Sequence, residues 1–327
     1  MRAGAGVARY LAGRVAAALL VVWAAASVAF LVLHLLPGDP VQIMLGNGYQ
    51  ASPGMADRIR HDYGFDRPLA VQYARFLGRL LHGDLGTSYQ QQRPVTAIIG
   101  EQLGPTLQLA AAATVLVVLV AGLLALATAG TGAGRGPLAR VGRFGRSLVS
   151  GVELTAISLP SFWLGILLLT VFSFRLRLLP AAGEGGLAAL LLPAVTLALP
   201  AAGLLSQVLR DGMQAAWQEP FTLTARSRGL SERAVRARHT LRHAALPALN
   251  LAGWFVGHLL GGAVLVETVF ARPGLGKVAL EAVTSRDIPV VLGVVMAAAA
   301  AFAVVSTVVD LLCLAVDPRL RVRRAAV

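Results

Sequence analysis

Residues 210–247 read RDGMQAAWQEPFTLTARSRGLSERAVRARHTLRHAALP and form a polar stretch between two long apolar segments. The run before Gly229 can form a short helix, and Ser231 can cap a second helix with Glu232 in its positive first turn. Gly229 supplies a turn position without a Cβ penalty. After Ser231, apolar residues recur at helical spacing and leave a basic face. The stretch therefore predicts two short helices joined by a turn, with a basic surface.

The composition is that of a membrane protein. Of the 327 residues, 56% are hydrophobic and 14% are charged, with a mean hydropathy of +0.70, whereas a soluble domain is about 25% charged. A net charge of +13 would suggest nucleic acid in a soluble chain. Here the arginines lie between apolar segments, so the positive-inside rule explains them, and we expect no nucleic-acid partner. Cys313 is the only cysteine, which excludes an internal disulfide or a cysteine metal site.

Six apolar segments predict an all-α polytopic membrane protein with six transmembrane helices. The first could also be a signal peptide, but its apolar run of roughly 20 residues exceeds a signal h-region and suits a bilayer-spanning helix. Residues 37–102 are polar and too long for a turn, which indicates an extramembrane subdomain. The expected organisation is 1–36, the N-terminus with the first span; 37–102, the subdomain; and 103–327, a core with five spans that includes 210–247. The six segments lie at about 15–36, 105–129, 148–174, 187–209, 247–270 and 290–316.

The distribution of basic residues predicts that both termini are cytoplasmic. An inside N-terminus assigns eighteen arginines to the cytoplasm and only five basic residues to the short outer loops. The cytoplasmic set is Arg2, Arg9, Arg14, Arg135, Arg140, Arg143, Arg146, Arg210, Arg226, Arg228, Arg233, Arg236, Arg238, Arg242, Arg319, Arg321, Arg323 and Arg324. The outer set is Arg175, Arg177, Arg272, Lys277 and Arg286.

The 210–247 stretch resembles the ATPase-docking loop of ABC-importer permeases, and more narrowly that of the peptide and nickel importer branch, whose loop reads near TARAKGLSE…RHALRNALLP. The residues that carry this resemblance are Thr224, Ala225, Arg226, Gly229, Leu230, Ser231, Glu232, Arg238, His239 and Pro247. In that family the loop inserts a short coupling helix into a groove on a cytoplasmic ATPase. The general importer motif has Glu-Ala-Ala ahead of the glycine; here Leu223, Thr224 and Ala225 stand there, a departure that the peptide branch shares.

Further motifs of that branch follow along nearly the whole chain. Residues 35–40, 63–73 and 83–88 are similar to its first-span signature and to its LGLDRPL…QY and GDLGTS runs. Residues 267–277 and 286–290 are similar to its VETVFSWPGLGRL and RDYPVV runs. The resemblance implies outer-face or gate roles for Pro37, Gly38, Asp39, Pro40, Asp84, Gly86, Glu267, Phe270, Pro273, Gly274, Gly276, Asp287 and Pro289.

The Gly-x-Gly-Lys ending of the 267–277 run is not a phosphate loop. A Walker loop needs a glycine where Ala271 stands and a hydroxyl residue where Val278 stands. We therefore expect no cofactor in this chain and no enzymatic activity of its own. The resemblance implies that partner ATPases bind ATP and Mg²⁺.

The resemblance implies a MetI-like ABC-importer permease fold and a set of partners. These are a second homologous permease subunit, one or two cytoplasmic ABC ATPases, an extracytoplasmic solute-binding protein and the lipid bilayer of a bacterial or archaeal cytoplasmic membrane. The chain would form half of a heterodimeric pore that alternates between inward and outward openings. Di- and oligopeptides lead as substrates, and nickel or metal-chelate complexes and some sugars are the alternatives.

Ionisable residues within spans are functional candidates because charge in hydrocarbon is expensive. Glu153 lies in the third segment, Glu267 at the end of the fifth and Asp310 in the sixth, the last two matching family positions with structural or gating character. His34 and His258 are more often helix–helix hydrogen bonders than metal or proton sites. The roles of His34, His258 and Glu153 stay open.

Two other classes of protein compete with an importer permease. An intramembrane protease would need a nucleophile context such as Gly-x-Ser-x-Gly, which none of the serines in the spans has. A secondary transporter would show inverted repeats with broken helices, and six spans with one polar loop near the end show no such symmetry. Its uptake would depend on a proton gradient and resist vanadate.

Overall fold

The computed structural model describes residues 2–35, 41, 53–129, 137–183 and 186–316. All the named elements in these ranges are helices, and the only strand-like pairing there is an isolated bridge between Thr87 and Pro94. The chain divides into two compact units, the first made of Met1–Thr106 with Pro273–Val304 and the second of Leu107–Arg272 with Val305–Val327.

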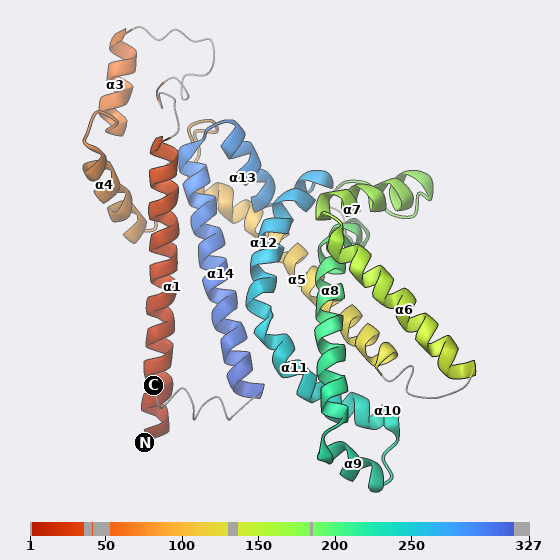
Figure 1. Ribbon diagram of the computed structural model, residues 1–327. Coiled ribbons are helices and arrows are strands. Elements are labelled where there is room, and N and C mark those ends of the chain that lie inside the picture. The colour runs from red at the N-terminus through yellow and green to blue at the C-terminus, as the bar shows by residue number, and fades with distance from the viewer. Residues whose placement is uncertain (1, 36–40, 42–52, 130–136, 184–185, 317–327) are drawn as a thin grey trace. The chain divides into compact units, whose positions relative to one another are not determined.

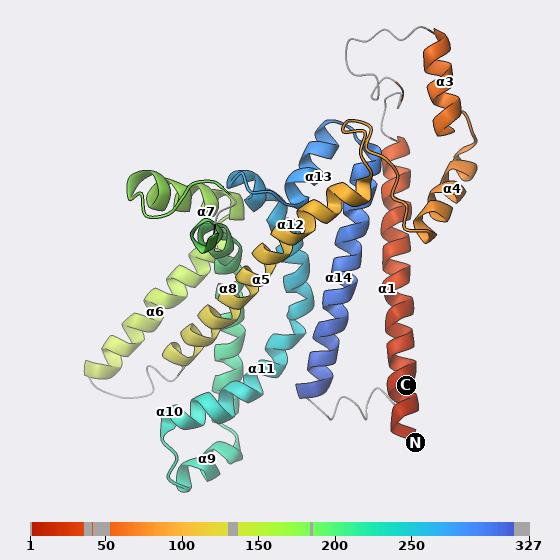
Figure 2. The same cartoon turned by 180° about the vertical axis from the view of Figure 1, so that it is seen from behind.

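The first unit is built around two long helices that run alongside each other, α1 and α14 (Figures 1 and 2). Phe30 of α1 stacks on Phe76 of α4 at a centroid distance of 5.5 Å, and Leu292 and Met296 of α14 complete this cluster. A second cluster joins the beginning of α5 to α13 and α14. The helices of this unit are α1 (Arg2–Leu35), α3 (Pro53–Tyr63), α4 (Leu69–Leu81), the beginning of α5 (Val95–Thr128), α13 (Leu275–Thr284) and α14 (Ile288–Val316).

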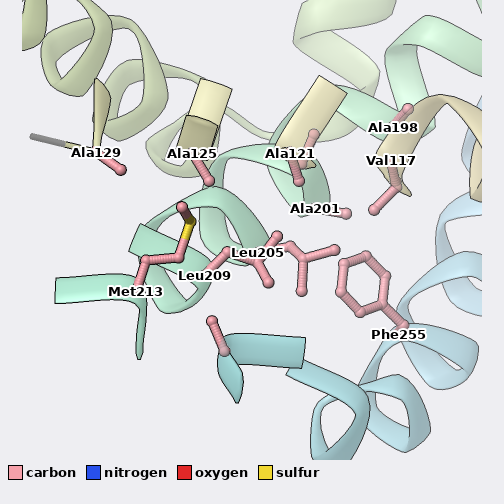
Figure 3. Packing of buried hydrophobic residues seen from close by; sticks show 12 residues of the cluster. Val117, Ala121, Ala125, Ala129, Ala198, Ala201, Leu205, Leu209, Met213 and Phe255 are labelled. Carbon is pink, nitrogen blue, oxygen red and sulfur yellow. The ribbon is translucent and has the colours of Figure 1, made fainter. Parts of the chain in front are cut away.

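The second unit is organised around α8, which packs against α6, α7, α11 and α12. Alanines spaced by four residues on α5, Ala121 and Ala125, face Leu205 and Leu209 of α8 (Figure 3). Small side chains allow the helix backbones to approach closely, which is how helices pack in lipid. Besides α5, the elements of this unit are α6 (Pro137–Ser158), α7 (Ser161–Leu168), η1 (Leu169–Arg175), α8 (Gly186–Trp217), α9 (Pro220–Ser227), α10 (Glu232–Val235), η2 (Arg236–Thr240), α11 (Leu241–Asn250) and α12 (Ala252–Val269).

Four helical stretches of the described chain are long and apolar enough to cross a membrane. They are Ala12–Val32, Val95–Thr128, Gly186–Trp217 and Ile288–Val309, and a bent pair makes up to five. The apolar part of α12 within the fifth predicted segment, Gly257–Val269, is shorter. The membrane-spanning all-α character is therefore confirmed, whereas the count of six spans stays a prediction.

The third predicted segment, 148–174, is not one continuous helix. The structure breaks it between Ser158 and Ser161. The chain direction bends by 113° between the stretches Phe144–Ser158 and Ser161–Arg175. Pro160 accounts for the break, because a proline has no backbone N–H and its ring disfavours helical geometry in the preceding residue. By contrast, Pro193 and Pro200 lie inside α8 without ending it.

Candidate functional site

The polar stretch forms the predicted pair of short helices. Pro220 begins α9, and the Thr222 hydroxyl donates to the carbonyl oxygens of Trp217 and Glu219, both at 2.8 Å. After α9 the chain turns at Gly229, whose φ of +85° lies in the left-handed region. The Ser231 hydroxyl accepts a hydrogen bond from the backbone N–H of Ala234 at 3.3 Å, which confirms the predicted cap. We call residues 220–240 the hairpin.

Trp217, the last residue of α8, joins the hairpin to the rest of the unit. The guanidinium carbon of Arg226 lies 5.5 Å from a ring centroid of its indole, and that of Arg236 lies 5.1 Å away. Both distances are in the cation–π range. Phe221 also stacks on His243 of α11 at 4.5 Å between ring centroids. These contacts hold both arms of the hairpin against α8 and α11, and no local sequence pattern predicts them.

The hairpin presents most of its family-matched residues to solvent. Thr224, Arg226, Gly229, Ser231 and Arg238 are exposed, whereas Ala225 of α9 is buried. Leu223, on the outer side of α9, is 68% exposed. The other matched residues that are exposed are Leu230, Glu232 and Pro247, and His239 is half-buried. An exposed leucine among arginines can fill an apolar pocket on a partner while the charges surround it.

The second arm of the hairpin departs from regular α-helix. Residues Arg236–Thr240 form a π-helical turn, in which Thr240 is fully buried and donates its hydroxyl proton to the Arg236 carbonyl oxygen at 3.0 Å. Such turns are rare and lie frequently at functional sites. The sequence shows only ordinary helical periodicity here, so it does not predict the π-helical turn.

In the first unit, Asp287 joins two stretches that the sequence analysis named separately. Its buried carboxylate accepts hydrogen bonds from the Ser88 hydroxyl at 2.5 Å, from the Tyr89 backbone N–H at 3.1 Å and from the Gln90 backbone N–H at 3.2 Å. Three donors compensate the loss of hydration of a buried carboxylate. Asp287 therefore fixes the turn after residue 87 to the beginning of α14.

The neighbouring turn is built from the predicted residues Asp84 and Gly86. The Asp84 carboxylate accepts from the Gly86 backbone N–H at 2.8 Å, and Gly86 has a φ of +84°. The Gly86 carbonyl oxygen accepts from the Val95 N–H at 2.9 Å, where α5 begins. Nearby, Arg93 pairs with Glu101, and this side-chain hydrogen bond raises the pKa of the Arg93 guanidinium. Pro289 lies in the first turn of α14, close to Gly86.

The 267–277 run divides between the two units. In the second unit, Glu267 and Phe270 are buried at the end of α12, and Phe270 packs close to Gly165 of α7. Arg272 is also buried there and donates to Gln108 of α5 at 3.4 Å. In the first unit, Pro273, Gly274 and Gly276 lead into α13, where the Thr106 hydroxyl accepts from the Leu275 N–H at 2.8 Å.

Glu153 has a buried partner that lies far from it in the sequence. It forms an ion pair with Arg210 of α8, and the two side chains are 2% and 4% exposed. Ser206 donates to the other Glu153 oxygen at 2.5 Å, and Arg210 also donates to Ser150 at 3.0 Å. By contrast, the Glu232 side chain that pairs with Arg236 in the hairpin is 58% exposed.

Several predicted residues lie outside the described part of the chain. These are Pro37, Gly38, Asp39 and Pro40, together with the side chains of His34 and Asp310. His258 is half-buried on α12. Within the described residues no three His, Cys, Asp or Glu side chains come together as a metal site would require.

Comparisons with known proteins agree with the arrangement of helices and motifs. Residues 127–322 match the family described as the binding-protein-dependent transport system inner membrane component, and residues 7–110 match the N-terminal part of such membrane components. A protein of Brucella abortus (strain 2308) named as a peptide transport system permease is 36% identical over 316 residues, which are 94% of this chain and 97% of the relative.

Glutathione permeases are similar over almost the same length. The glutathione transport system permease protein GsiC of Salmonella paratyphi A is 36% identical over 296 residues, covering 90% of this chain and 93% of the relative. The protein of the same name from Salmonella typhimurium is 35% identical over 296 residues, with the same coverage. The chain therefore belongs to the family of inner membrane components of binding-protein-dependent transport systems, and it is a permease component of an ABC importer and not an enzyme.

Proposed function

We propose that this chain forms one half of a heterodimeric pore that imports di- or oligopeptides. Two kinds of relative support peptides as the substrate class: the Brucella protein is named for peptides, and the Salmonella proteins are named for glutathione, itself a tripeptide. Nickel and metal-chelate complexes remain the alternative cargo, but none of the relatives above is named for them. In such importers the binding protein determines most of the substrate specificity.

The hairpin is the proposed docking element for a cytoplasmic ATPase. The observation that carries this proposal is the combination of an exposed Leu223 with a hairpin base held by Trp217. An exposed apolar anchor supplies binding energy when it is buried in a partner's groove. Because Trp217 contacts both arms of the hairpin, a displacement of the hairpin can move α8 without the hairpin itself bending. Closure of the ATPases would then move α8 and shift the pore between its two openings.

The remaining parts of the machine follow from this assignment. The proposed complex contains a second homologous permease, one or two ATPases that bind ATP and Mg²⁺, and an extracytoplasmic solute-binding protein that docks near residues 37–102. Both termini lie in the cytoplasm of a bacterial or archaeal cell, as the basic residues indicate. Residues 103–327 form the permease core, which follows the N-terminal span in 1–36. The turn tied by Asp287, together with Asp84, Gly86 and Pro289, belongs to the outer face.

Cross-linking from the hairpin tests the docking proposal directly. In a Cys313→Ser background, Leu223→Cys should form a cross-link with the ATPase in native membranes, and the link should change in yield when ATP and vanadate are added. Leu187→Cys is the matched control, since Leu187 is an 86% exposed leucine at the other end of α8. No cross-link from Leu223→Cys under any nucleotide condition would contradict the assignment.

Co-purification tests the proposed partners and the cargo. The tagged chain, extracted gently from its native membrane, should co-elute with a second permease, one or two ATPases and a binding protein. The ligand retained by that binding protein would identify the substrate as a peptide or a metal complex. A chain that elutes alone in every mild detergent would favour a secondary transporter.

A further inference from the structure

One face of α6 meets one face of α8 through polar side chains at three successive levels and through a close backbone approach at the fourth. On α6 the residues are Arg146, Ser150, Glu153 and Ile157, and on α8 they are Gln214, Arg210, Ser206 and Gly203. Residues three and four apart lie on the same face of a helix, so each set forms one stripe. The contacts run in antiparallel order along the two stripes, which together we call the α6–α8 seam.

The contacts of the seam are closely spaced and mostly charged. The Gln214 amide faces the Arg146 guanidinium; when the amide is assigned with its oxygen on that side, it accepts from both guanidinium nitrogens at 2.7 and 3.2 Å. One turn further, Arg210 donates to Ser150 and pairs with Glu153, which also accepts from Ser206. At the last contact, a Cβ on Gly203 would lie 3.2 Å from the Glu153 carbonyl oxygen and 3.3 Å from the Ile157 side chain. The absence of a side chain at Gly203 therefore allows the two backbones to approach.

The buried ion pair fixes the register of the two helices. Sliding α6 past α8 by one turn, about 5.4 Å, would separate Arg210 from Glu153 and leave two unpaired charges in a buried setting. Such charges are very unfavourable, more so within a bilayer. A purely apolar interface lacks this penalty, because lipid tails solvate apolar side chains as well as another helix does. The seam thus holds α6 and α8 in a single arrangement.

The seam lies between the hairpin and the break in the third segment. Arg210 precedes Trp217 by seven residues, about two helical turns, and Trp217 holds Arg226 and Arg236 of the hairpin. At the other end, α6 stops at Ser158 and turns by 113° into α7. A displacement of α8 therefore reaches the bend through α6, provided that the seam stays closed.

We propose that the α6–α8 seam, with Glu153 and Arg210 as its positioning residues, makes α6 and α8 move as one body during transport, so that movement of the hairpin reaches the bend at Leu159–Pro160. This inference rests on the proposed docking of the hairpin to an ATPase. It assigns a role in coupling to two residues that touch neither the ATPase nor the cargo.

The first test removes the pair without leaving an unpaired charge. The double variant Glu153→Leu/Arg210→Met keeps apolar volume in the interface, and such replacements of buried pairs are often tolerated. The complete complex in proteoliposomes is supplied with its binding protein and an equimolar pool of di- and tripeptides. Peptide imported per ATP hydrolysed should fall about two- to thirty-fold, the range found for substitutions in coupled networks. ATP hydrolysis itself should be retained.

Controls separate this inference from the docking proposal. Glu281→Gln removes an exposed pairing partner of Lys277 on α13. It should leave the amount of peptide imported per ATP hydrolysed unchanged. The Leu223→Cys cross-link to the ATPase should persist in the double variant. If the cross-link forms but the double variant imports as much peptide per ATP hydrolysed as the parent does, the seam proposal is wrong and the docking proposal stands. If the parent chain gives no cross-link, the docking proposal and the seam proposal fall together.

The second test asks whether the two helices must separate. In a Cys313→Ser/Arg210→Met background, which leaves no unpaired charge, Glu153→Cys/Ser206→Cys places two thiols across the seam, where the native side chains touch at 2.5 Å. Before cross-linking, this variant should show the same loss of coupling as the double variant. Joining the thiols by oxidation or a short bifunctional reagent should restore import, because a covalent link replaces the pair. Import that stays low, or falls further, would overturn the proposal.

Discussion

The Ser88 hydroxyl donates a 2.5 Å hydrogen bond to the buried carboxylate of Asp287, which lies 199 residues further along the chain. The backbone N–H groups of Tyr89 and Gln90 also donate hydrogen bonds to this carboxylate. A single acidic side chain thus holds the turn that precedes α5 against the beginning of α14. The stability of variants at Asp287, compared with that of a variant at an exposed ion pair, shows whether this buried carboxylate stabilises the fold.

Asp287→Asn should destabilise the protein by about 2 kcal/mol, because the amide NH₂ faces a donor and the charge-assisted bonds are lost. Ser88→Ala should be milder, since the carboxylate keeps its two backbone donors. The measurement is the thermal midpoint of the detergent-solubilised protein, together with the rate of proteolysis after residue 88. Glu281→Gln, on the exposed side of α13, serves as the control. Equal midpoints for Asp287→Asn and this control would show that the tie contributes nothing.

Gly229→Val should uncouple ATP hydrolysis from transport while leaving insertion intact. Gly229 has a φ of +85°, and a side chain there would meet open space, so the effect arises from the backbone and not from a clash. A β-branched residue in the left-handed region is unfavourable by about 1–2 kcal/mol or more. Gly229→Asn is the matched comparison, since asparagine tolerates this region.

Uptake and ATP hydrolysis in the reconstituted complex distinguish these two Gly229 variants. Asn should retain most of the transport and Val should lose it. Normal uptake by Gly229→Val would remove the basis for treating this turn as part of the coupling element.

Trp217→Ala should loosen the hairpin, because it removes the aromatic face that Arg226 and Arg236 share. Loss of about 1–2 kcal/mol of cation–π attraction would raise trypsin cleavage at the hairpin arginines roughly tenfold, if cleavage follows the open population. Trp217→Phe should lie between Ala and the parent. Trp163→Ala, at an exposed tryptophan on α7, is the control. Cleavage of Trp217→Ala at the parent's rate would show that the rings do not hold the hairpin.

Gly212→Ala should destabilise the contact between α8 and α11. A Cβ at this position would lie 2.9 Å from the Ala244 Cβ and 3.0 Å from its Cα, so the backbones must move apart. Overpacking of this kind costs about 1–3 kcal/mol. Gly151→Ala, at a helical glycine with open space around it on α6, should be neutral or slightly stabilising. Similar thermal midpoints for both alanine variants would contradict the close approach.

The hairpin was predictable because its determinants are local. Its first helix follows Pro220, its turn needs the positive φ that Gly229 adopts, and Ser231 caps the next helix through an N–H three residues away. Apolar runs likewise predicted the long helices from their own composition. The family and its transport role also followed from short motifs that keep their order along the chain.

Contacts between distant segments could not be predicted in the same way. Glu153 was noted as an intramembrane charge, but nothing near it in the sequence identified Arg210, 57 residues away, as its partner. Trp217 could have drawn attention as an aromatic residue at the end of an apolar segment, yet its two arginine partners depend on how the hairpin folds back. The apolar run 148–174 is long enough for one continuous span, and only the structure shows its bend of 113° at Pro160.

The sequence by itself determined the helices, the caps, the turn at Gly229 and the family, because each depends on neighbours within one or two helical turns or on an ordered motif. Only the tertiary structure decided which polar groups pair, as in the α6–α8 seam and at Asp287. The physical reason is that buried charges and hydroxyls take the partner that helix register and backbone approach bring within reach. For Glu153, that register depends on Gly203, where no side chain holds α6 and α8 apart.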